Sequence, residues 1–137
     1  MPGNLKVNPS CIFQLLQVMP ESENFLIKAR RTGRSRSATV KTFLAGIAQS
    51  IITGKLLFDT GGTPTIMHRN TIDRMKNPPR DVVLESYVLF FAKKTQLNLV
   101  RPKVNYGKRL YGTSHWQRGL LSEFKLLLRI LSQARNW

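Results

Sequence analysis

Acidic residues are scarce in this chain of 137 residues. Seven Asp and Glu stand against 22 Lys and Arg, which gives a formal net charge of +15. A charge of this size repels itself unless a polyanion or a dense counterion cloud neutralises it. No apolar run approaches the roughly 20 residues needed to span a bilayer, so we expect no membrane partner. The composition therefore favours nucleic acid as the partner.

Cysteine and histidine are also rare. Cys11 is the only cysteine, which excludes an internal disulfide and a Cys-rich zinc site and fits a reducing compartment. His68 and His115 have no carboxylate partner or cysteine nearby in the sequence, so they suggest neither a metal site nor a nucleophile–base pair. Gly61-Gly62 alone indicates a turn and not a phosphate loop. We expect no enzymatic activity, no cofactor and no metal.

The chain has room for one domain with a modest core. We interpret residues 1–23 as an N-terminal extension and 24–137 as a single RNA-binding domain. The first residues lack a charged segment followed by a long apolar one, and Glu21 and Glu23 interrupt a possible amphipathic presequence. If the protein works in an organelle, we expect that it is made there.

Two long stretches contain no acidic residue, one on either side of a centre of mixed charge. The first, from Asn24 to Phe58, and the second, from Ser86 to Ser122, could each line one face of an RNA. Their cationic residues are Lys28, Arg30, Arg31, Arg34, Arg36, Lys41 and Lys55 in the first, and Lys93, Lys94, Arg101, Lys103, Lys108, Arg109 and Arg118 in the second.

The first stretch divides into a strand, a loop and a helix. Phe25-Leu26-Ile27 is a short apolar run typical of a strand, and the Arg-, Gly- and Ser-rich segment 30–37 predicts a loop. Ser37 is the expected N-cap of a helix that ends at Gly54. The apolar residues at helical spacing are Val40, Phe43, Leu44, Ile47, Ala48, Ile51 and Ile52. This stripe predicts a mostly buried helix that lies on a sheet, with Phe43 and Leu44 in the core.

The remaining elements complete the predicted fold. We expect a strand over 55–59, a loop to about Pro79, and a hairpin whose strands are 81–91 and 97–100, with a turn over 92–96. The segment 114–117 has the spacing of a capping box. A second helix follows with the stripe Leu120, Phe124, Leu127, Leu128 and Leu131. The pattern predicts an α+β fold, a two-layer sandwich with two helices packed on one face of a mixed or antiparallel sheet.

The arginine-rich loop is the sharpest functional feature. Its small residues let the backbone approach a phosphate, and each guanidinium can donate two hydrogen bonds to phosphate oxygens or a base edge. The alternative is a solvated loop with incidental charge. We expect the following cations to contact RNA here: Lys28, Arg30, Arg31, Arg34 and Arg36.

A second basic group flanks Asn77-Pro78-Pro79, and it comprises Arg69, Arg74, Lys76 and Arg80. Adjacent prolines stiffen a loop, so these residues could form a basic finger that inserts into folded RNA. An ordinary turn before a strand is the alternative. Several aromatic residues could stack on unpaired bases, but we expect Phe90 and Trp116 to belong to the core.

The order of these parts resembles the universal large-subunit ribosomal protein sixteen family, which includes bacterial L-sixteen and eukaryotic L-ten. The resemblance runs from about Phe25 to the C-terminus and rests on colinearity. The matching segments are Phe25-Leu26-Ile27-Lys28-Ala29, Gly33-Arg34, Gly54-Lys55, Arg74-Met75, Glu85-Ser86-Tyr87-Val88 and Glu123-Phe124-Lys125-Leu126. In that family the segment that corresponds to Glu85–Val88 is a strand.

The resemblance implies a structural protein of the large ribosomal subunit. Its partners would be large-subunit ribosomal RNA, neighbouring ribosomal proteins and tRNA, near the aminoacyl-tRNA path and the peptidyl transferase region. The loop Lys76–Arg80 would point toward that region, although it replaces the glycine-lysine loop of the family. Such drift, with no visible import signal, indicates a mitochondrial ribosome in the matrix; a plastid or the bacterial cytoplasm is the alternative.

Two other interpretations remain open. The segment from Glu85 to Leu99 also resembles the small-subunit ribosomal protein ten, with larger gaps and no counterpart of the final helix. A basic nucleic-acid-binding regulator outside the ribosome is the other alternative, and it would be soluble alone with a discrete target.

Overall fold

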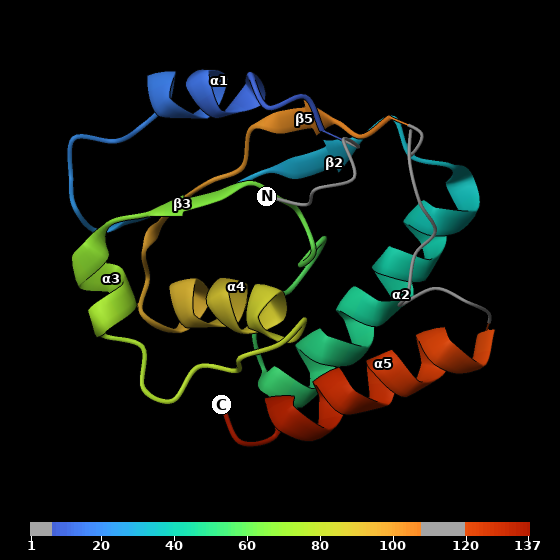
Figure 1. Ribbon diagram of the computed structural model, residues 1–137. Helices are drawn as coiled ribbons and strands as arrows, with labels where there is room; N and C mark the ends of the chain where they lie inside the picture. The colour runs from blue at the N-terminus through green and yellow to red at the C-terminus, as the bar shows by residue number, and fades with distance from the viewer. Residues whose placement is uncertain (1–6, 108–119) are drawn as a thin grey trace.

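A computed structural model describes residues 7–107 and 120–137 of the chain. Within these residues five helices and five strands form an α+β fold (Figure 1). In chain order they are α1 (Cys11–Gln17), β1 (Phe25–Lys28), β2 (Arg30–Thr32), α2 (Arg36–Thr53), β3 (Thr65–Met67), α3 (Arg69–Asp73), α4 (Leu84–Lys94), β4 (Asn98–Val100), β5 (Lys103–Asn105) and α5 (Leu120–Ala134). The predicted α+β class is confirmed.

Strand β1 is the centre of a three-stranded mixed sheet with the order β3-β1-β4. It runs antiparallel to β3, with Ile27 opposite Ile66, and parallel to β4, with Leu26 opposite Leu99. All four of its residues are buried, as expected of a strand covered on both faces. The short strands β2 and β5 form a separate parallel pair. The predicted strand at Phe25–Ile27 and the mixed sheet are thus confirmed.

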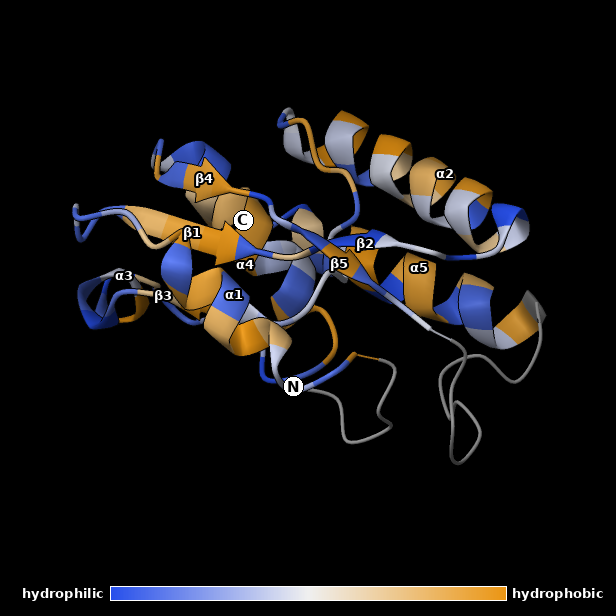
Figure 2. Ribbon diagram, turned by 90° about the horizontal axis from the view of Figure 1, so that it is seen from above, coloured by the Kyte–Doolittle hydropathy of each residue, from blue (hydrophilic) through white to orange (hydrophobic). Residues whose placement is uncertain are grey.

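Helices α1 and α4 cover opposite faces of this sheet (Figures 1 and 2). Phe25 and Ile27 pack with Cys11 and Leu15 of α1, whereas Leu26 packs with residues of α4. This division follows from the alternation of side chains along a strand. Val7 also belongs to the first cluster, so the segment before Asn24 contributes to the core from its first described residue.

The predicted hairpin over 81–100 is wrong, because residues 84–94 form helix α4. Seven of its eleven residues are buried, and a continuous apolar run buried on most sides fits a strand and a helix equally well by periodicity. Glu85 in the first turn and Lys93 and Lys94 in the last turn complement the helix dipole. The predicted second strand exists as β4, but it pairs with β1.

The segment after α2 also differs from the prediction. Residues 55–59 form no strand; the Leu57 N–H donates to the Ser50 hydroxyl oxygen over 2.8 Å, which holds this loop on α2. Strand β3 and helix α3 lie where the sequence predicts a loop, and both are only a few residues long. Elements this short bury too few residues to leave a periodic pattern.

Helix α2 begins at Arg36 with Ser35 as its N-cap, so the prediction of Ser37 is wrong. The Ala38 N–H donates to the Ser35 hydroxyl oxygen over 3.3 Å. The helix ends at Gly54, as predicted, where a φ of 63° is readily adopted by glycine.

The predicted burial of α2 is wrong. Phe43 and Leu44 are 54% and 59% exposed, and Figure 2 shows apolar residues along the outer edge of the helix. The helix packs on α5 and on the loop at Leu57 instead of the sheet, and a Cβ at Gly46 would lie 2.6 Å from the Leu57 carbonyl oxygen. An apolar stripe predicts a helix, but it does not identify what covers the stripe.

The exposure of α2 predicts a contrast in stability. Leu44→Ser should change the free energy of unfolding by no more than about 0.5 kcal/mol, because surface substitutions rarely do more. Leu89→Ala should cost about 2 to 5 kcal/mol, because Leu89 is fully buried and truncation leaves a cavity. Urea unfolding of both variants measures the difference. Equal losses would contradict the packing of α2.

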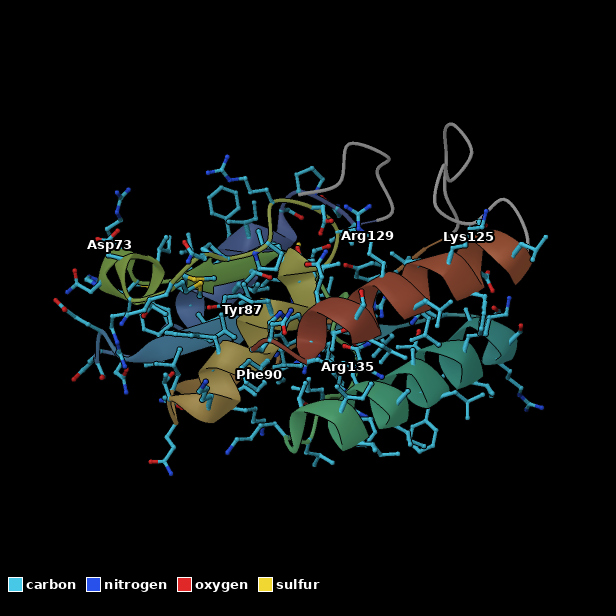
Figure 3. All side chains as sticks on the ribbon, turned by 90° about the horizontal axis from the view of Figure 1, so that it is seen from below. Asp73, Tyr87, Phe90, Lys125, Arg129 and Arg135 are labelled. Carbon is cyan, nitrogen blue, oxygen red and sulfur yellow. The ribbon has the colours of Figure 1, made fainter. Side chains whose placement is uncertain are left out.

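Helix α5 confirms the predicted C-terminal helix, while the capping box at 114–117 lies outside the described residues. Two ion pairs tie this helix to the domain. Glu123 accepts from Lys41 of α2 over 2.7 Å, and Arg129 contacts Asp81 over 2.5 Å. Figure 3 shows Lys125 and Arg129 along α5, with Tyr87 and Phe90 on the neighbouring α4.

Candidate nucleic-acid interface

The parallel strand pairs bring the basic residues together. Arg30 and Lys103 are register partners in the β2–β5 pair, and both are exposed. The Arg30 N–H donates to the Pro102 carbonyl over 2.8 Å, which fixes this edge. Because β1 and β4 run in the same direction, Arg101 after β4 lies beside the residues that follow β1. Like charges so placed repel each other unless an anion lies between them.

Asp59 is the anion at the centre of this group. Its carboxylate accepts from the Arg31 backbone N–H over 2.8 Å and from the Arg31 Nε over 2.5 Å. The Arg34 and Arg101 guanidiniums lie 4.0 and 3.7 Å from the same carboxylate. We call these four residues, together with the exposed Arg30, the Asp59 cluster. Three guanidiniums thus share one carboxylate, and with Arg30 beside them the cluster keeps a strong positive charge.

The guanidiniums of the cluster are held in place by neutral groups as well. Arg34 donates to the Thr42 hydroxyl over 2.8 Å, and Arg101 donates to the carbonyls of Phe58 and Asp59 over 3.1 and 3.0 Å. Burial is the main cause that lowers the pKa of both Arg34 and Arg101 from the ordinary arginine value. Both remain cationic at neutral pH. Cations already removed from water and oriented are well suited to bind an anion.

The Asp59 cluster opens onto a pocket of about 510 Å³ that also has an aromatic wall. Phe43 and Phe58 line it, and their rings stack with centroids 5.5 Å apart and planes 7° apart. Thr39 and Thr42 add hydroxyl groups from α2. Guanidiniums can bind phosphate oxygens, and a flat apolar ring beside them can contact a base or a ribose.

Lys28 is not part of this surface, although the sequence predicts it to contact RNA. Its side chain is 0% exposed, forms an ion pair with Glu85 of α4, and lies 3.3 Å from the Thr65 hydroxyl. Lys28 and Leu26 are two residues apart on β1, so both face α4. The lysine is therefore part of the core between the sheet and α4.

The other predicted site residues fall into two groups. Arg30, Arg31 and Arg34 line the pocket of the Asp59 cluster, and Arg36 is exposed at the start of α2 nearby. The second predicted group does not join them. Its members are all exposed, with Arg69 paired to Asp73 on α3, Arg74 bonded to Asn24, and Lys76 and Arg80 on the loop before α4.

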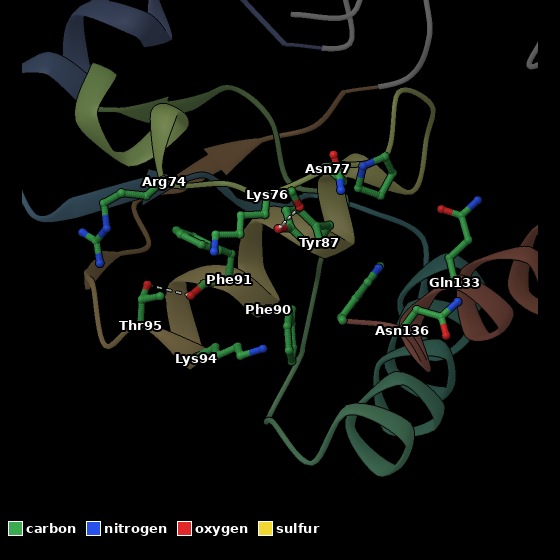
Figure 4. Close-up of a pocket in the computed structure, with 12 residues that line it drawn as sticks. Arg74, Lys76, Asn77, Tyr87, Phe90, Phe91, Lys94, Thr95, Gln133 and Asn136 are labelled. Atoms are coloured by element: carbon green, nitrogen blue, oxygen red, sulfur yellow. Dashed lines mark hydrogen bonds between the residues drawn. The ribbon is translucent and has the colours of Figure 1, made fainter.

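The loop from Lys76 to Arg80 is fastened to the domain on both sides. The Tyr87 hydroxyl donates to the Lys76 carbonyl over 3.3 Å, and Asp81, which follows the loop, pairs with Arg129 of α5 over 2.5 Å. Lys76 and Pro79 line a second pocket against α4, where Figure 4 shows Lys76 beside Tyr87 and Phe91. Of the two interpretations that the sequence leaves open, the structure thus favours a turn that lies on the domain, here before a helix, over a projecting basic finger.

Sequence reasoning did not assign Arg101, Asp59, Phe43 or Phe58 to the site. Arg101 lies in the second acid-free stretch, and a prediction of parallel pairing between β1 and β4 would have placed it beside Arg31. The apolar stripe of Phe43 predicts a place in the core, whereas the side chain is half exposed. Asp59 is the acid that ends the first acid-free stretch, and this position is the sequence signal for its place among the arginines.

Other kinds of site find no support in the described residues. Across 7–107 and 120–137, no group of three or more His, Cys, Asp or Glu gathers to hold a metal ion. None of the helices described there is long and apolar enough to cross a membrane. Comparisons with protein-family models, curated proteins and solved structures find no match.

Asp59→Asn tests the electrostatics of the cluster. Asp59 has a φ of 48°, which asparagine also tolerates, so the backbone should be preserved. We expect a loss of about 1 to 2 kcal/mol in the free energy of unfolding, because charge-assisted bonds become neutral ones and the guanidiniums repel each other. Raising the salt concentration should reduce the loss by screening that repulsion.

The control for this variant is Asp73→Asn, which removes the same charge from an exposed ion pair on α3. It should change the stability by less than about 0.5 kcal/mol. Thermal unfolding at two salt concentrations gives both numbers. Equal, salt-independent effects of the two variants would show that Asp59 does not organise the arginines.

Proposed function

We propose that this protein is a structural, RNA-binding constituent of the ribosome and has no enzymatic activity. One observation carries the proposal: Arg31, Arg34 and Arg101 converge on the Asp59 carboxylate at the rim of a pocket that Arg30 also lines. An excess of fixed guanidiniums beside a stacked aromatic pair suits a phosphate backbone with unpaired bases. The net charge of +15 supports a polyanionic partner of large size.

The resemblance in sequence supports the large subunit as the location, with ribosomal RNA and neighbouring ribosomal proteins as partners. The same resemblance supports a place near the aminoacyl-tRNA path, with the Lys76–Arg80 loop toward the peptidyl transferase region and tRNA. The mitochondrial matrix is the proposed compartment, because the sequence drifts from the bacterial pattern. These finer assignments rest on colinear segments alone.

Small-subunit ribosomal protein ten is a second candidate, because helix α4 counts against one segment of the large-subunit resemblance. The large-subunit resemblance implies a strand at Glu85–Val88, whereas these residues are helical in this protein. The segment Glu85–Val88 therefore no longer supports the large-subunit resemblance. The small-subunit resemblance covers the same region to Leu99, but it leaves α5 without a counterpart.

Sedimentation decides between these candidates. A tagged copy of the protein is followed through a gradient that separates the ribosomal subunits, with and without ribonuclease treatment of the lysate. We expect it in the large-subunit fractions and expect ribonuclease to release it. A peak in the small-subunit fractions would overturn the large-subunit assignment. A ribonuclease-insensitive peak at the top of the gradient would overturn the ribosomal function.

A further inference from the structure

A second pocket, remote in sequence from the Asp59 cluster, is lined by α4, the C-terminal end of α5 and the loop after α3 (Figure 4). Its volume is about 600 Å³, within the range of pockets that hold small organic ligands. Neither the proposed rRNA contact at the Asp59 cluster nor the core explains it. Its lining combines aromatic rings, cations and side-chain amides.

The aromatic wall is centred on Trp137. Its indole ring meets Tyr87 edge-on with centroids 5.5 Å apart and lies 5.4 Å from Phe90. Tyr87 and Phe90 are buried, whereas Trp137 remains partly exposed in the pocket lining. Two buried rings thus fix the orientation of a third ring that solvent still reaches. A fixed, accessible indole is a good surface for stacking.

The pocket is cationic. Arg74, Lys76 and Lys94 line it, and no carboxylate side chain is found among its described lining residues. The Lys94 Nζ lies 5.4 Å from the Phe90 ring centroid, which holds this ammonium beside the aromatic wall. Arg74 donates to the neutral side-chain amide oxygen Oδ1 of Asn24 over 3.1 Å. The charge of these groups is therefore left for an external anion.

Amide groups supply directional hydrogen bonds. Gln133 and Asn136 reach the pocket from the end of α5, and Asn77 reaches it from the loop (Figure 4). Each amide can donate and accept, as the edge of a nucleobase requires. A ligand that matches this lining has a flat ring, hydrogen-bonding edges and an attached anion.

We propose that this pocket binds one unpaired nucleotide of RNA, with the base stacked on Trp137 and the phosphate bound by Lys76 and Lys94. A base inside a duplex cannot reach the indole, because both of its faces are already stacked. The inference rests on the proposed RNA-binding function but concerns a separate site. It predicts that the protein prefers single-stranded RNA to a duplex of equal charge.

The test measures the affinity of the full chain for a labelled RNA hexamer, for the same hexamer with abasic nucleotides and for a duplex of the same length. The variants are Trp137→Ala, Trp137→Phe and Lys94→Gln, with Lys125→Gln on the exposed side of α5 as the charge control. Trp137→Ala should weaken hexamer binding about five- to a hundredfold. It should leave duplex and abasic binding unchanged.

Trp137→Phe should retain most of the affinity, and Lys94→Gln should weaken hexamer binding more than Lys125→Gln does. Because Trp137 packs on Tyr87 and Phe90, unfolding curves are recorded for every variant. If Trp137→Ala is less stable, Lys94→Gln decides the question. Hexamer binding that Lys94→Gln weakens no more than Lys125→Gln does would overturn the pocket while leaving the Asp59 cluster standing. A wild-type protein that binds none of these RNAs would overturn both.

Discussion

Replacing Arg30 and Arg36 with glutamine is expected to weaken RNA binding about tenfold for each guanidinium removed. A hydrogen bond to a charged group contributes about 1.5 to 3 kcal/mol, and 1.4 kcal/mol corresponds to a tenfold change in affinity. Both side chains are exposed, so the fold should be unaffected. The slope of log affinity against log salt should fall by about 0.7 to 0.9 for each lost phosphate contact.

Arg69→Gln is the matched control for these variants. It removes an equal charge from an exposed position on α3 where Asp73 already compensates it. Its effect on the salt slope should be smaller than that of Arg30→Gln or Arg36→Gln. If Arg69→Gln and Arg30→Gln change the slope equally, RNA binding is diffuse and the Asp59 cluster is not the contact. Arg31→Gln is less informative, because Arg31 also holds Asp59.

Truncating Glu85 is expected to lower the stability strongly, although its side chain is partly exposed. Glu85→Ala leaves the fully buried ammonium of Lys28 without its carboxylate. Breaking a buried pair costs about 3 to 5 kcal/mol, and we expect about 2 to 4 here because Glu85 is 37% exposed and partly screened by water. Lys28→Met should be near neutral or stabilising, because it removes the buried charge itself. Denaturant unfolding of both variants and of the double variant measures this asymmetry.

The same pair predicts a dependence on pH. Burial is the main cause that lowers the pKa of Lys28 below 10.5, and the Glu85 carboxylate only partly opposes it. Between the lowered pKa and 10.5 the unfolded chain binds more protons than the folded one, so stability contributed by Lys28 rises with pH in that window. The difference in free energy of unfolding by which Lys28→Met exceeds the wild type should therefore shrink as the pH approaches 10.5. A difference that grows with pH would contradict the burial of Lys28.

The fold could be predicted where the sequence pattern and the burial agree. Phe25–Ile27 is an apolar run too short for a helix, the leucine stripe of α5 has a clear helical period, and both elements are present. Residues 84–94 could not be assigned, because an apolar run buried on most sides has no period that separates a strand from a helix. The predicted burial of α2 is wrong for another reason. Its apolar stripe faces away from the sheet, and the sequence of a helix does not show which element covers its stripe.

The candidate site could be predicted only in part. Arg30, Arg31 and Arg34 are close together in the chain, so their charge alone identifies them as candidate RNA contacts. Arg101 and Asp59 join them through the parallel pairing of β1 and β4 and through the loop after α2, which are long-range features. Lys28 has the same charge as its neighbours, and only the alternation along β1 separates it from them. Trp137 reaches its pocket through the packing of α5 near α4.

Cross-linking of RNA to the protein inside the native particle tests the central claim most directly. Particles that contain the tagged protein are irradiated with ultraviolet light, digested, and analysed by mass spectrometry for peptides that carry nucleotides. We predict cross-links in the peptides that contain Arg30 to Phe43, Phe58 and Arg101, at the Asp59 cluster. Cross-links confined to peptides far from this cluster, or particles whose tagged protein carries no RNA, would contradict the account.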